Sequence, residues 1–278
     1  MKKLFLLLPI CVILLTSCNL PFVKSSPVSA SLVNTKVAQT LQAKATSENL
    51  TQTIQPTLSL TATPTLTPKI TSTPTVSPDD PRLTLGTATY TNSFNDASTD
   101  GSAFGLKTPI KDDAITFSIK NGSLLMTSFR LKGGPRWRLA YQTPRNLYLE
   151  GTFKTVSCQG ADYYGLVYRE PAYDNGIGYY FGISCDGKYY LMRYDGSDPH
   201  VLVDWTADPA ILSGSNQENR IGVMVKDDQM SLYINGKLIT KTSNDVLKEK
   251  GHFGVFQYAV EDPNMTVQVE EINEWNQP

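Results

Sequence analysis

Histidine is almost absent from this chain of 278 residues, which contains only His200 and His252. Two histidines cannot build a His-rich metal site, the HExxH zinc motif is missing, and no Ser-His-Asp arrangement can be argued from them. Charge of one sign is not in excess either, since 25 Lys and Arg stand against 26 Asp and Glu. A net charge near −1 argues against a dedicated nucleic-acid partner. A mean hydropathy of −0.23 excludes a polytopic membrane protein.

Long hydrophobic runs are confined to the first twenty residues. A short positive segment precedes an apolar one at 4–15, which suits an export signal and is too short to span a bilayer comfortably. The following Leu-Thr-Ser-Cys, ending at Cys18, resembles the lipobox of bacterial lipoproteins. The resemblance implies removal of residues 1–17, diacylglycerol and acyl chains such as palmitate on Cys18, and a lipid-anchored position on the extracytoplasmic side of the cell membrane. An ordinary signal peptide with an incidental cysteine is the alternative.

Residues 18–82 are expected to form a disordered linker between the lipid anchor and the rest of the chain. From Thr51 to Pro78, 18 of 28 residues are Thr, Ser or Pro, and Lys69 is the only charge. Such a stretch cannot bury enough apolar surface to offset chain entropy, and its prolines favour extended polyproline II structure. At about 3.1 Å per residue, the stretch would reach roughly 90 Å when fully extended.

Residues 83–278 show the alternation typical of β-strands and no convincing helical period. Three two-residue turns that tolerate positive φ, at 121–122, 186–187 and 235–236, predict three hairpins. The strands expected to pair across these turns are 114–120 with 123–129, 178–184 with 188–194, and 229–234 with 237–242. Further strands are expected at 136–142, 147–156, 163–169, 200–205, 219–226, 253–258 and 265–272. Strands of this number and length predict an all-β sandwich of antiparallel sheets.

Seven short segments of this region form an ordered series. They are Tyr-Gly-Leu-Val-Tyr-Arg (164–169), Tyr-Tyr-Phe (179–181), Asp-Gly-Lys-Tyr (186–189), Asp-Trp (204–205), Asn-Arg-Ile (219–221), Leu-Tyr-Ile-Asn-Gly (232–236) and Gly-His-Phe-Gly (251–254). In this order they resemble the concanavalin A-like lectin/glucanase superfamily, in its LamG-like and 3-keto-disaccharide-hydrolase-like branches, from about Thr89 to Trp275. The resemblance implies a jelly roll of two curved sheets, with glycans often bound on the concave face or its rim. The superfamily also contains adhesion and structural modules, so the fold alone does not decide the function.

The resemblance also raises the question of a metal ion. Jelly rolls of this superfamily often carry a structural calcium ion, and Asn95, Asp96 and Asp100 would supply oxygen ligands at a suitable spacing. Loops rich in Asx residues usually form turns instead. No cofactor or metal site is therefore assigned, and calcium stays an open alternative.

The two central hairpins predict which side chains share a sheet face. A loop over 170–177 places Gly165 opposite Gly182, and the two-residue turn at 186–187 places Tyr180 opposite Arg193. One face, expected to be core, then carries Tyr164, Leu166, Tyr168, Tyr179, Phe181, Ile183, Tyr190 and Met192. The other face carries Gly165, Val167, Arg169, Tyr180, Gly182, Tyr189 and Arg193.

This second face is the expected binding site. Two glycines side by side leave a shallow depression, and the arginine and tyrosine side chains around it suit sugar hydroxyls, carboxylates and ring faces. The expected ligand-binding residues are Arg169, Tyr180, Arg193 and Arg220 on the face, with Tyr173 and Trp205 at the rim. A solvated sheet face with ordinary surface arginines is the alternative.

A disulfide is expected between Cys158 and Cys185, the only cysteines after Cys18. Export places them in an oxidising compartment, and each lies at the end of a predicted strand. The bridge would close a loop of 27 residues and stabilise the fold by about 3 kcal/mol. Two buried thiols are the alternative.

Paired carboxylates, which glycosidases hold about 5–10 Å apart, are not found at a suitable spacing on any predicted strand. Glu270 and Glu271 are adjacent and face opposite ways, and Asp162 and Glu170 are too far apart to act together. No catalytic residue is therefore assigned. The expected function is non-catalytic binding of a glycan or cell-surface polymer. A glycoside hydrolase and a protein–protein adhesion or assembly module are the alternatives.

Overall fold

The computed structural model describes residues 76–277. The expected signal peptide, the lipidation site Cys18 and the linker up to residue 75 lie outside the described residues, so these expectations stay predictions. Within the described part, no helix has the length and apolar character needed to cross a membrane.

Short antiparallel strands dominate the described chain. The strands are β1 (Tyr90–Asn92), β2 (Ile110–Lys111), β3 (Ile115–Lys120), β4 (Ser123–Ser128), β5 (Arg136–Leu139), β6 (Leu147–Ser157), β7 (Tyr163–Glu170), β8 (Gly178–Ser184), β9 (Lys188–Tyr194), β10 (Pro199–Ala207), β11 (Glu218–Lys226), β12 (Gln229–Ile234), β13 (Lys237–Ser243), β14 (His252–Tyr258) and β15 (Thr266–Asn276). Two short helices, α1 (Arg82–Leu85) and η1 (Gly101–Phe104), accompany them.

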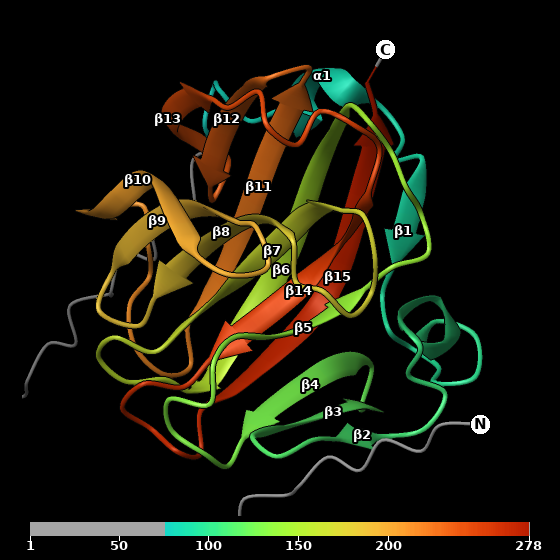
Figure 1. The fold of residues 1–278 in the computed structure, drawn as a ribbon, viewed down its shortest axis with the longest axis vertical. Helices are drawn as coiled ribbons and strands as arrows, with labels where there is room; N and C mark the ends of the chain where they lie inside the picture. Colours follow the sequence, from blue (N-terminus) through green and yellow to red (C-terminus); the bar gives the residue numbers. More distant parts are fainter. Residues whose placement is uncertain (1–75, 278) are drawn as a thin grey trace, which may run out of the picture. The chain divides into compact units, whose positions relative to one another are not determined.

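The strands form two antiparallel sheets packed face to face (Figure 1). The larger sheet has nine strands, in the order β13-β12-β11-β6-β15-β4-β3-β2, with β1 paired to β15. The smaller sheet has six, in the order β10-β9-β8-β7-β14-β5. The all-β sandwich expected from the sequence is confirmed, and every expected strand is present. Sequence alternation missed β1 and β2, because strands of three and two residues are too short to show a period.

Two of the three expected hairpins close as predicted. Asn121 and Gly122 have φ of 54° and 75°, and the residues that flank this turn, Lys120 and Ser123, are paired. Asn235 and Gly236 repeat the geometry with φ of 52° and 79°. Asparagine and glycine tolerate positive φ, so these turns are local properties of the chain.

The core lies between the inner faces of the two sheets. Tyr164 of β7 in the smaller sheet packs on Phe153 of β6 in the larger one, with ring centroids 5.5 Å apart. Successive side chains of a strand point to opposite faces of its sheet, so every second residue points into the core. Fully buried examples are Phe117, Leu149, Leu166, Phe181, Val223, Leu232, Phe253 and Ile272.

The expected disulfide joins Cys158 and Cys185, whose Cα atoms lie 5.5 Å apart. Cys158 follows β6 of the larger sheet and Cys185 follows β8 of the smaller one. The bridge therefore ties the two sheets together at one end of the sandwich.

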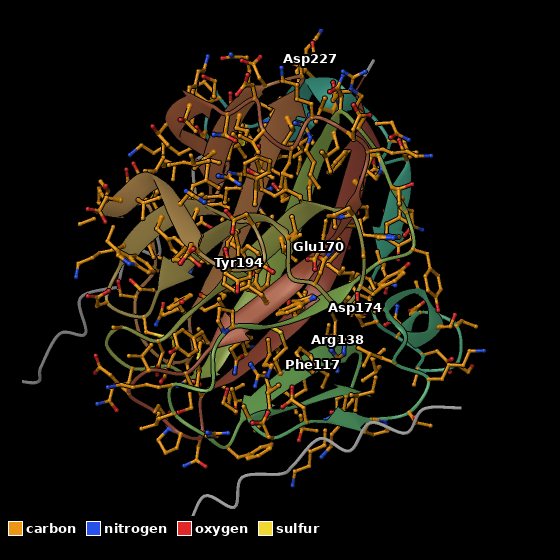
Figure 2. The ribbon with its side chains drawn as sticks, in the orientation of Figure 1. Phe117, Arg138, Glu170, Asp174, Tyr194 and Asp227 are labelled. Carbon is orange, nitrogen blue, oxygen red and sulfur yellow. A yellow bond between two sulfur atoms is a disulfide. The ribbon has the colours of Figure 1, made fainter. Side chains whose placement is uncertain are left out.

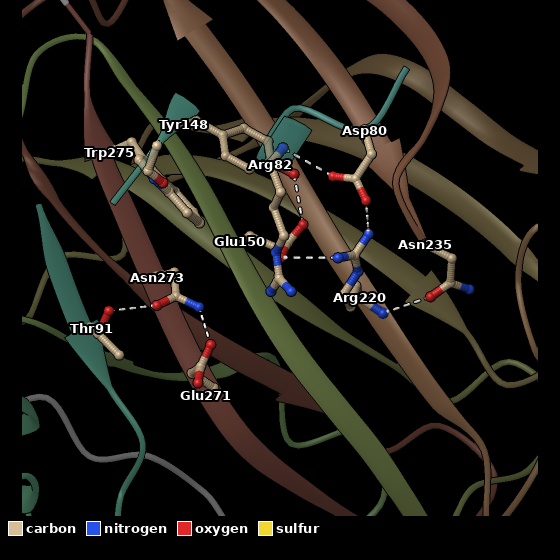
Figure 3. Close-up of polar contacts among 11 residues, drawn as sticks. Asp80, Arg82, Thr91, Tyr148, Glu150, Arg220, Asn235, Glu271, Asn273 and Trp275 are labelled. Atoms are coloured by element: carbon tan, nitrogen blue, oxygen red, sulfur yellow. Dashed lines mark hydrogen bonds and ion pairs between the residues drawn. The ribbon is translucent and has the colours of Figure 1, made fainter. Parts of the chain in front are cut away.

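The segment before β1 packs against the outer face of the larger sheet, although the linker was expected to extend to residue 82. Asp80 is only 5% exposed and forms an ion pair with Arg220 of β11 (Figure 3). Arg82 forms a second ion pair with Glu150 of β6. The partners lie far away in the sequence, so composition alone could not reveal them. The packed chain begins at least three residues before the expected Leu83.

Candidate functional site

A cluster of aromatic side chains, separate from the core between the sheets, covers the outer face of the six-stranded sheet. Tyr163 of β7 lies 5.3 Å from Tyr190 of β9, and Tyr180 of β8 lies 5.2 Å from Phe256 of β14, measured between ring centroids. Trp137 of β5 extends the cluster to the sheet edge, 6.5 Å from Tyr180. The outer face of the six-stranded sheet is therefore built mainly from aromatic side chains. The arginines expected on it are not part of this cluster.

The difference arises from the turn between β8 and β9. Tyr180 pairs with Met192 and not with Arg193, so the expected register is wrong by one residue. The loop contains three residues, because Cys185 joins the turn ahead of the glycine at 187, which has φ of 89°. A slip of one residue moves every side chain of a strand to the other face. Tyr190 and Met192 consequently lie on the outer face.

The depression expected between Gly165 and Gly182 is filled. The two glycines are paired as predicted. A Cβ atom on Gly182 would lie 2.6 Å from the ring of Tyr190 and 2.9 Å from that of Phe256. The glycines therefore make room for the floor of the aromatic cluster and do not leave a ligand site.

Two pockets open beside this cluster, each with a volume of about 410 Å³. Trp137 contributes to both, so they meet at this residue. The first, called the face pocket, is lined by Gly134, Pro135, Arg136, Trp137, Tyr163, Asn175, Tyr180, Met192, Tyr194 and Pro199. The second, called the edge pocket, is lined by Phe104, Gly105, Ile110, Trp137, Arg138, Leu139, Tyr141 and Tyr173.

The loop between β7 and β8, residues 171–177, connects the two pockets. Tyr173 stacks on His252 with ring centroids 4.2 Å apart, and its carbonyl accepts a hydrogen bond of 3.3 Å from Nε1 of Trp137. The carbonyl of Gly176 accepts a hydrogen bond of 2.9 Å from the hydroxyl of Tyr180. These contacts hold Tyr173 beside the edge pocket and the neighbouring Asn175 beside the face pocket.

Glu170 lies at the end of β7, directly before this loop, and is completely buried (Figure 2). Neither carboxylate oxygen has a hydrogen-bond partner of good geometry among residues 76–277. Burial raises the pKa of Glu170 to about 8, because the charged form loses its water. From its position in the sequence, Glu170 was expected only to be a carboxylate too far from Asp162 to act with it. Its burial follows from the loop, which spacing could not reveal.

Three of the six expected ligand-binding residues lie on or near this face. Tyr180 lines the face pocket and Tyr173 lines the edge pocket, where it is 49% exposed. Trp205 of β10 packs against Tyr190 with ring centroids 4.3 Å apart and is 41% exposed. It lines a smaller pocket of about 170 Å³ and neither of the two larger ones.

The three expected arginines lie elsewhere. Arg169 is 3% exposed and donates to the carbonyls of Arg145 and Leu247, so it holds two loops together. Arg193 of β9 lies opposite Tyr179 of β8, so its side chain is on the inner face of the smaller sheet. Arg220 belongs to the larger sheet and forms its ion pair with the N-terminal segment (Figure 3).

The asparagine- and aspartate-rich loop considered for calcium forms turns. Oδ1 of Asp96 accepts hydrogen bonds from the backbone N–H groups of Ser98 and Thr99. Oδ2 of Asp100 accepts one from the backbone N–H of Asn95. Among residues 76–277, no group of three or more His, Cys, Asp or Glu side chains is placed to hold a metal ion.

No protein-family model and no curated protein matches the sequence. Solved structures with a similar fold include a galectin-like protein of unknown function from Bacillus subtilis, with a TM-score of 0.53 and 15% identity over 69% of this chain and 97% of the other. A β-glucanase from Bacillus licheniformis has a TM-score of 0.50 and 10% identity over 69% of this chain and 100% of the other. The Crh5 transglycosylase in complex with NAG has a TM-score of 0.50 and 12% identity over 70% of this chain and 86% of the other. At such identities the likeness concerns the fold alone, and it confirms the expected concanavalin A-like jelly roll.

Proposed function

We propose that the sandwich binds a glycan or cell-surface polymer, without catalysis, in the two pockets that meet at Trp137. The observation that carries the proposal is that aromatic residues, from Tyr173 through Trp137 to Tyr180, line both pockets. Flat aromatic rings pack on the apolar faces of sugars, and a few polar groups at the rim, such as the Asn175 amide, supply hydrogen bonds to sugar hydroxyls.

The linings favour binding over hydrolysis. Among residues 76–277, none that lines the face pocket or the edge pocket is a carboxylate. Glycoside hydrolysis usually needs two carboxyl groups within about 5–10 Å of each other at the scissile bond. Asp174 lies within the connecting loop but lines neither pocket. Glu170, directly before the loop, is completely buried and cannot contact a ligand while the loop is in place.

The fold is compatible with this ligand class. Of the proteins of similar fold named above, one is a β-glucanase and another a transglycosylase in complex with NAG. Fold does not determine function, so this support is secondary to the aromatic lining of the pockets.

We also propose that the chain is a lipoprotein, anchored at Cys18 and facing the extracytoplasmic side of the membrane. The support is the apolar run at 4–15 followed by the lipobox-like sequence. Metabolic labelling of the full chain with an alkyne analogue of palmitate should mark the wild type and not Cys18→Ala. Equal labelling of both proteins would contradict the anchor.

The binding proposal is tested with the full chain and Trp137→Ala on a panel of immobilised polysaccharides. Loss of the ring shared by both pockets should weaken binding about tenfold or more, which corresponds to roughly 1.4 kcal/mol. The matched control is Phe129→Ala, because Phe129 is a 40% exposed aromatic residue that lines neither pocket.

Two results would overturn the binding proposal. The first is unchanged binding of Trp137→Ala, with Phe129→Ala behaving in the same way. The second is release of reducing sugar from the polymer by the wild type, which would favour a hydrolase.

A further inference from the structure

We propose that the edge pocket binds the carboxylate of an acidic sugar through Arg138, so that the ligand is a polysaccharide containing uronic acid. This inference rests on the proposed glycan binding and specifies the class of glycan. It starts from an arginine that the fold leaves without a counter-ion.

Most arginines of residues 76–277 already have an anionic partner. Arg82, Arg130, Arg136, Arg145, Arg193 and Arg220 each have a carboxylate oxygen within 4 Å. Arg169 instead donates to two backbone carbonyls. Arg138 has neither arrangement within the described residues, since its only hydrogen bond joins Nη1 to the carbonyl of Trp137 at 2.8 Å.

The side chain of Arg138 is held in place despite its lack of a counter-ion. Its guanidinium group lies 4.3 Å from the centre of the Phe117 ring, which gives a cation–π contact (Figure 2). The Nε–H is buried and has no acceptor among the described residues. Partial burial lowers the pKa of Arg138, because the charge has lost part of its water. A buried donor of this kind is costly unless a ligand or water supplies the acceptor.

The edge pocket provides the remaining features of an acidic-sugar site. Within the described part of the chain, Arg138 is the only charged residue that lines it. The rings of Tyr141 and Tyr173 border the same pocket and are 59% and 49% exposed. A sugar ring can pack on these aromatic groups while its carboxylate meets the planar guanidinium, whose donors match a carboxylate.

One neighbouring acidic side chain does not compete for this role. Asp112 is close enough to influence the pKa of Arg138. However, its Oδ2 accepts a hydrogen bond of 2.9 Å from Nε of Arg136, and its Oδ1 accepts from the backbone N–H groups of Ala114 and Ile115. Arg136, which lines the face pocket, is therefore neutralised, whereas Arg138 is not.

The test compares polygalacturonate with the same polymer after reduction of its carboxyl groups. The full-length wild type should bind polygalacturonate at least tenfold more tightly than the reduced polymer in isothermal titration calorimetry. Arg138→Gln should lose this preference, so that it binds polygalacturonate and the reduced polymer equally. Arg145→Gln is the matched control, because Arg145 is an exposed arginine outside both pockets.

The outcomes separate this inference from the proposed function. Equal binding of both polymers by the wild type would overturn the role of Arg138 and leave glycan binding intact. Retention of the preference by Arg138→Gln, with an unchanged thermal midpoint, would overturn it as well, as would preferential binding of dextran sulfate over polygalacturonate. Failure of the wild type to bind any polysaccharide would overturn both proposals.

Discussion

Replacing Glu170 with glutamine should stabilise the protein, and the gain should grow as the pH rises. The carboxyl group is completely buried without a hydrogen-bond partner of good geometry in the described part of the chain, and its pKa is raised from the ordinary 4.5 to about 8. Below pH 4.5, both the folded and the unfolded state hold the proton. Between pH 4.5 and 8, only the folded state holds it, so the wild type loses stability as the pH rises.

The size of the effect follows from these two pKa values. Each pH unit in this interval costs the wild type about 1.4 kcal/mol, so the accumulated loss above pH 8 is roughly 5 kcal/mol. Glutamine has the same shape and never ionises, so Glu170→Gln should not show this loss. The difference in unfolding free energy between variant and wild type should therefore be small near pH 4.5, rise with pH and level off above pH 8.

The assay is urea denaturation of the full chain at a series of pH values from 4.5 to 9. Glu218→Gln is the matched control, because Glu218 is an exposed carboxylate that forms no ion pair within residues 76–277 and does not influence the pKa of Glu170. Its difference from the wild type should stay near zero throughout. A constant difference between Glu170→Gln and the wild type over the whole range would refute the argument from desolvation.

Three further changes test the tertiary structure by denaturation of the full chain. Replacing Cys158 and Cys185 with alanine should cost about 3 kcal/mol, and a thiol reagent should label neither position in unreduced wild type; labelling of both positions, located by peptide mapping, would exclude the bridge. Arg220→Met should cost about 3 kcal/mol, since it leaves the buried Glu150 with one cation fewer; a loss below about 1 kcal/mol would contradict a buried network. Gly187→Ala should cost about 1–2 kcal/mol because of its φ of 89°, and an unchanged midpoint would argue against positive φ at this position.

Local chemistry explains why much of the fold was predictable. The Asn-Gly pairs at 121–122 and 235–236 have positive φ and close their hairpins as predicted. The alternation of strands such as 178–184 and 229–234 also coincides with β8 and β12. Both signals depend on neighbours within a few residues, so a single sequence contains them.

The turn between β8 and β9 shows where local chemistry was insufficient. The Asp186-Gly187 pair is compatible with loops of two or three residues. The N–H of Cys185 donates to the carbonyl of Asp162, and its carbonyl accepts from the N–H of Gly214. Cys185 therefore bonds to these segments and not to β9, and the turn contains three residues. The side chains of β9 consequently lie on the opposite faces from those expected, and Arg193 is not part of the expected site.

The sequence by itself determined the all-β class, the positions of the main strands and the identity of the cysteine pair, because these depend on alternation, turn chemistry and cysteine number. Only the tertiary structure decided which arginine is free to meet a ligand. Arg220 is neutralised by Asp80, which lies 140 residues away in the sequence, whereas Arg138 has no such partner within the described residues. Whether an arginine has a carboxylate partner depends on which distant segments fold against it. No local sequence pattern encodes those contacts.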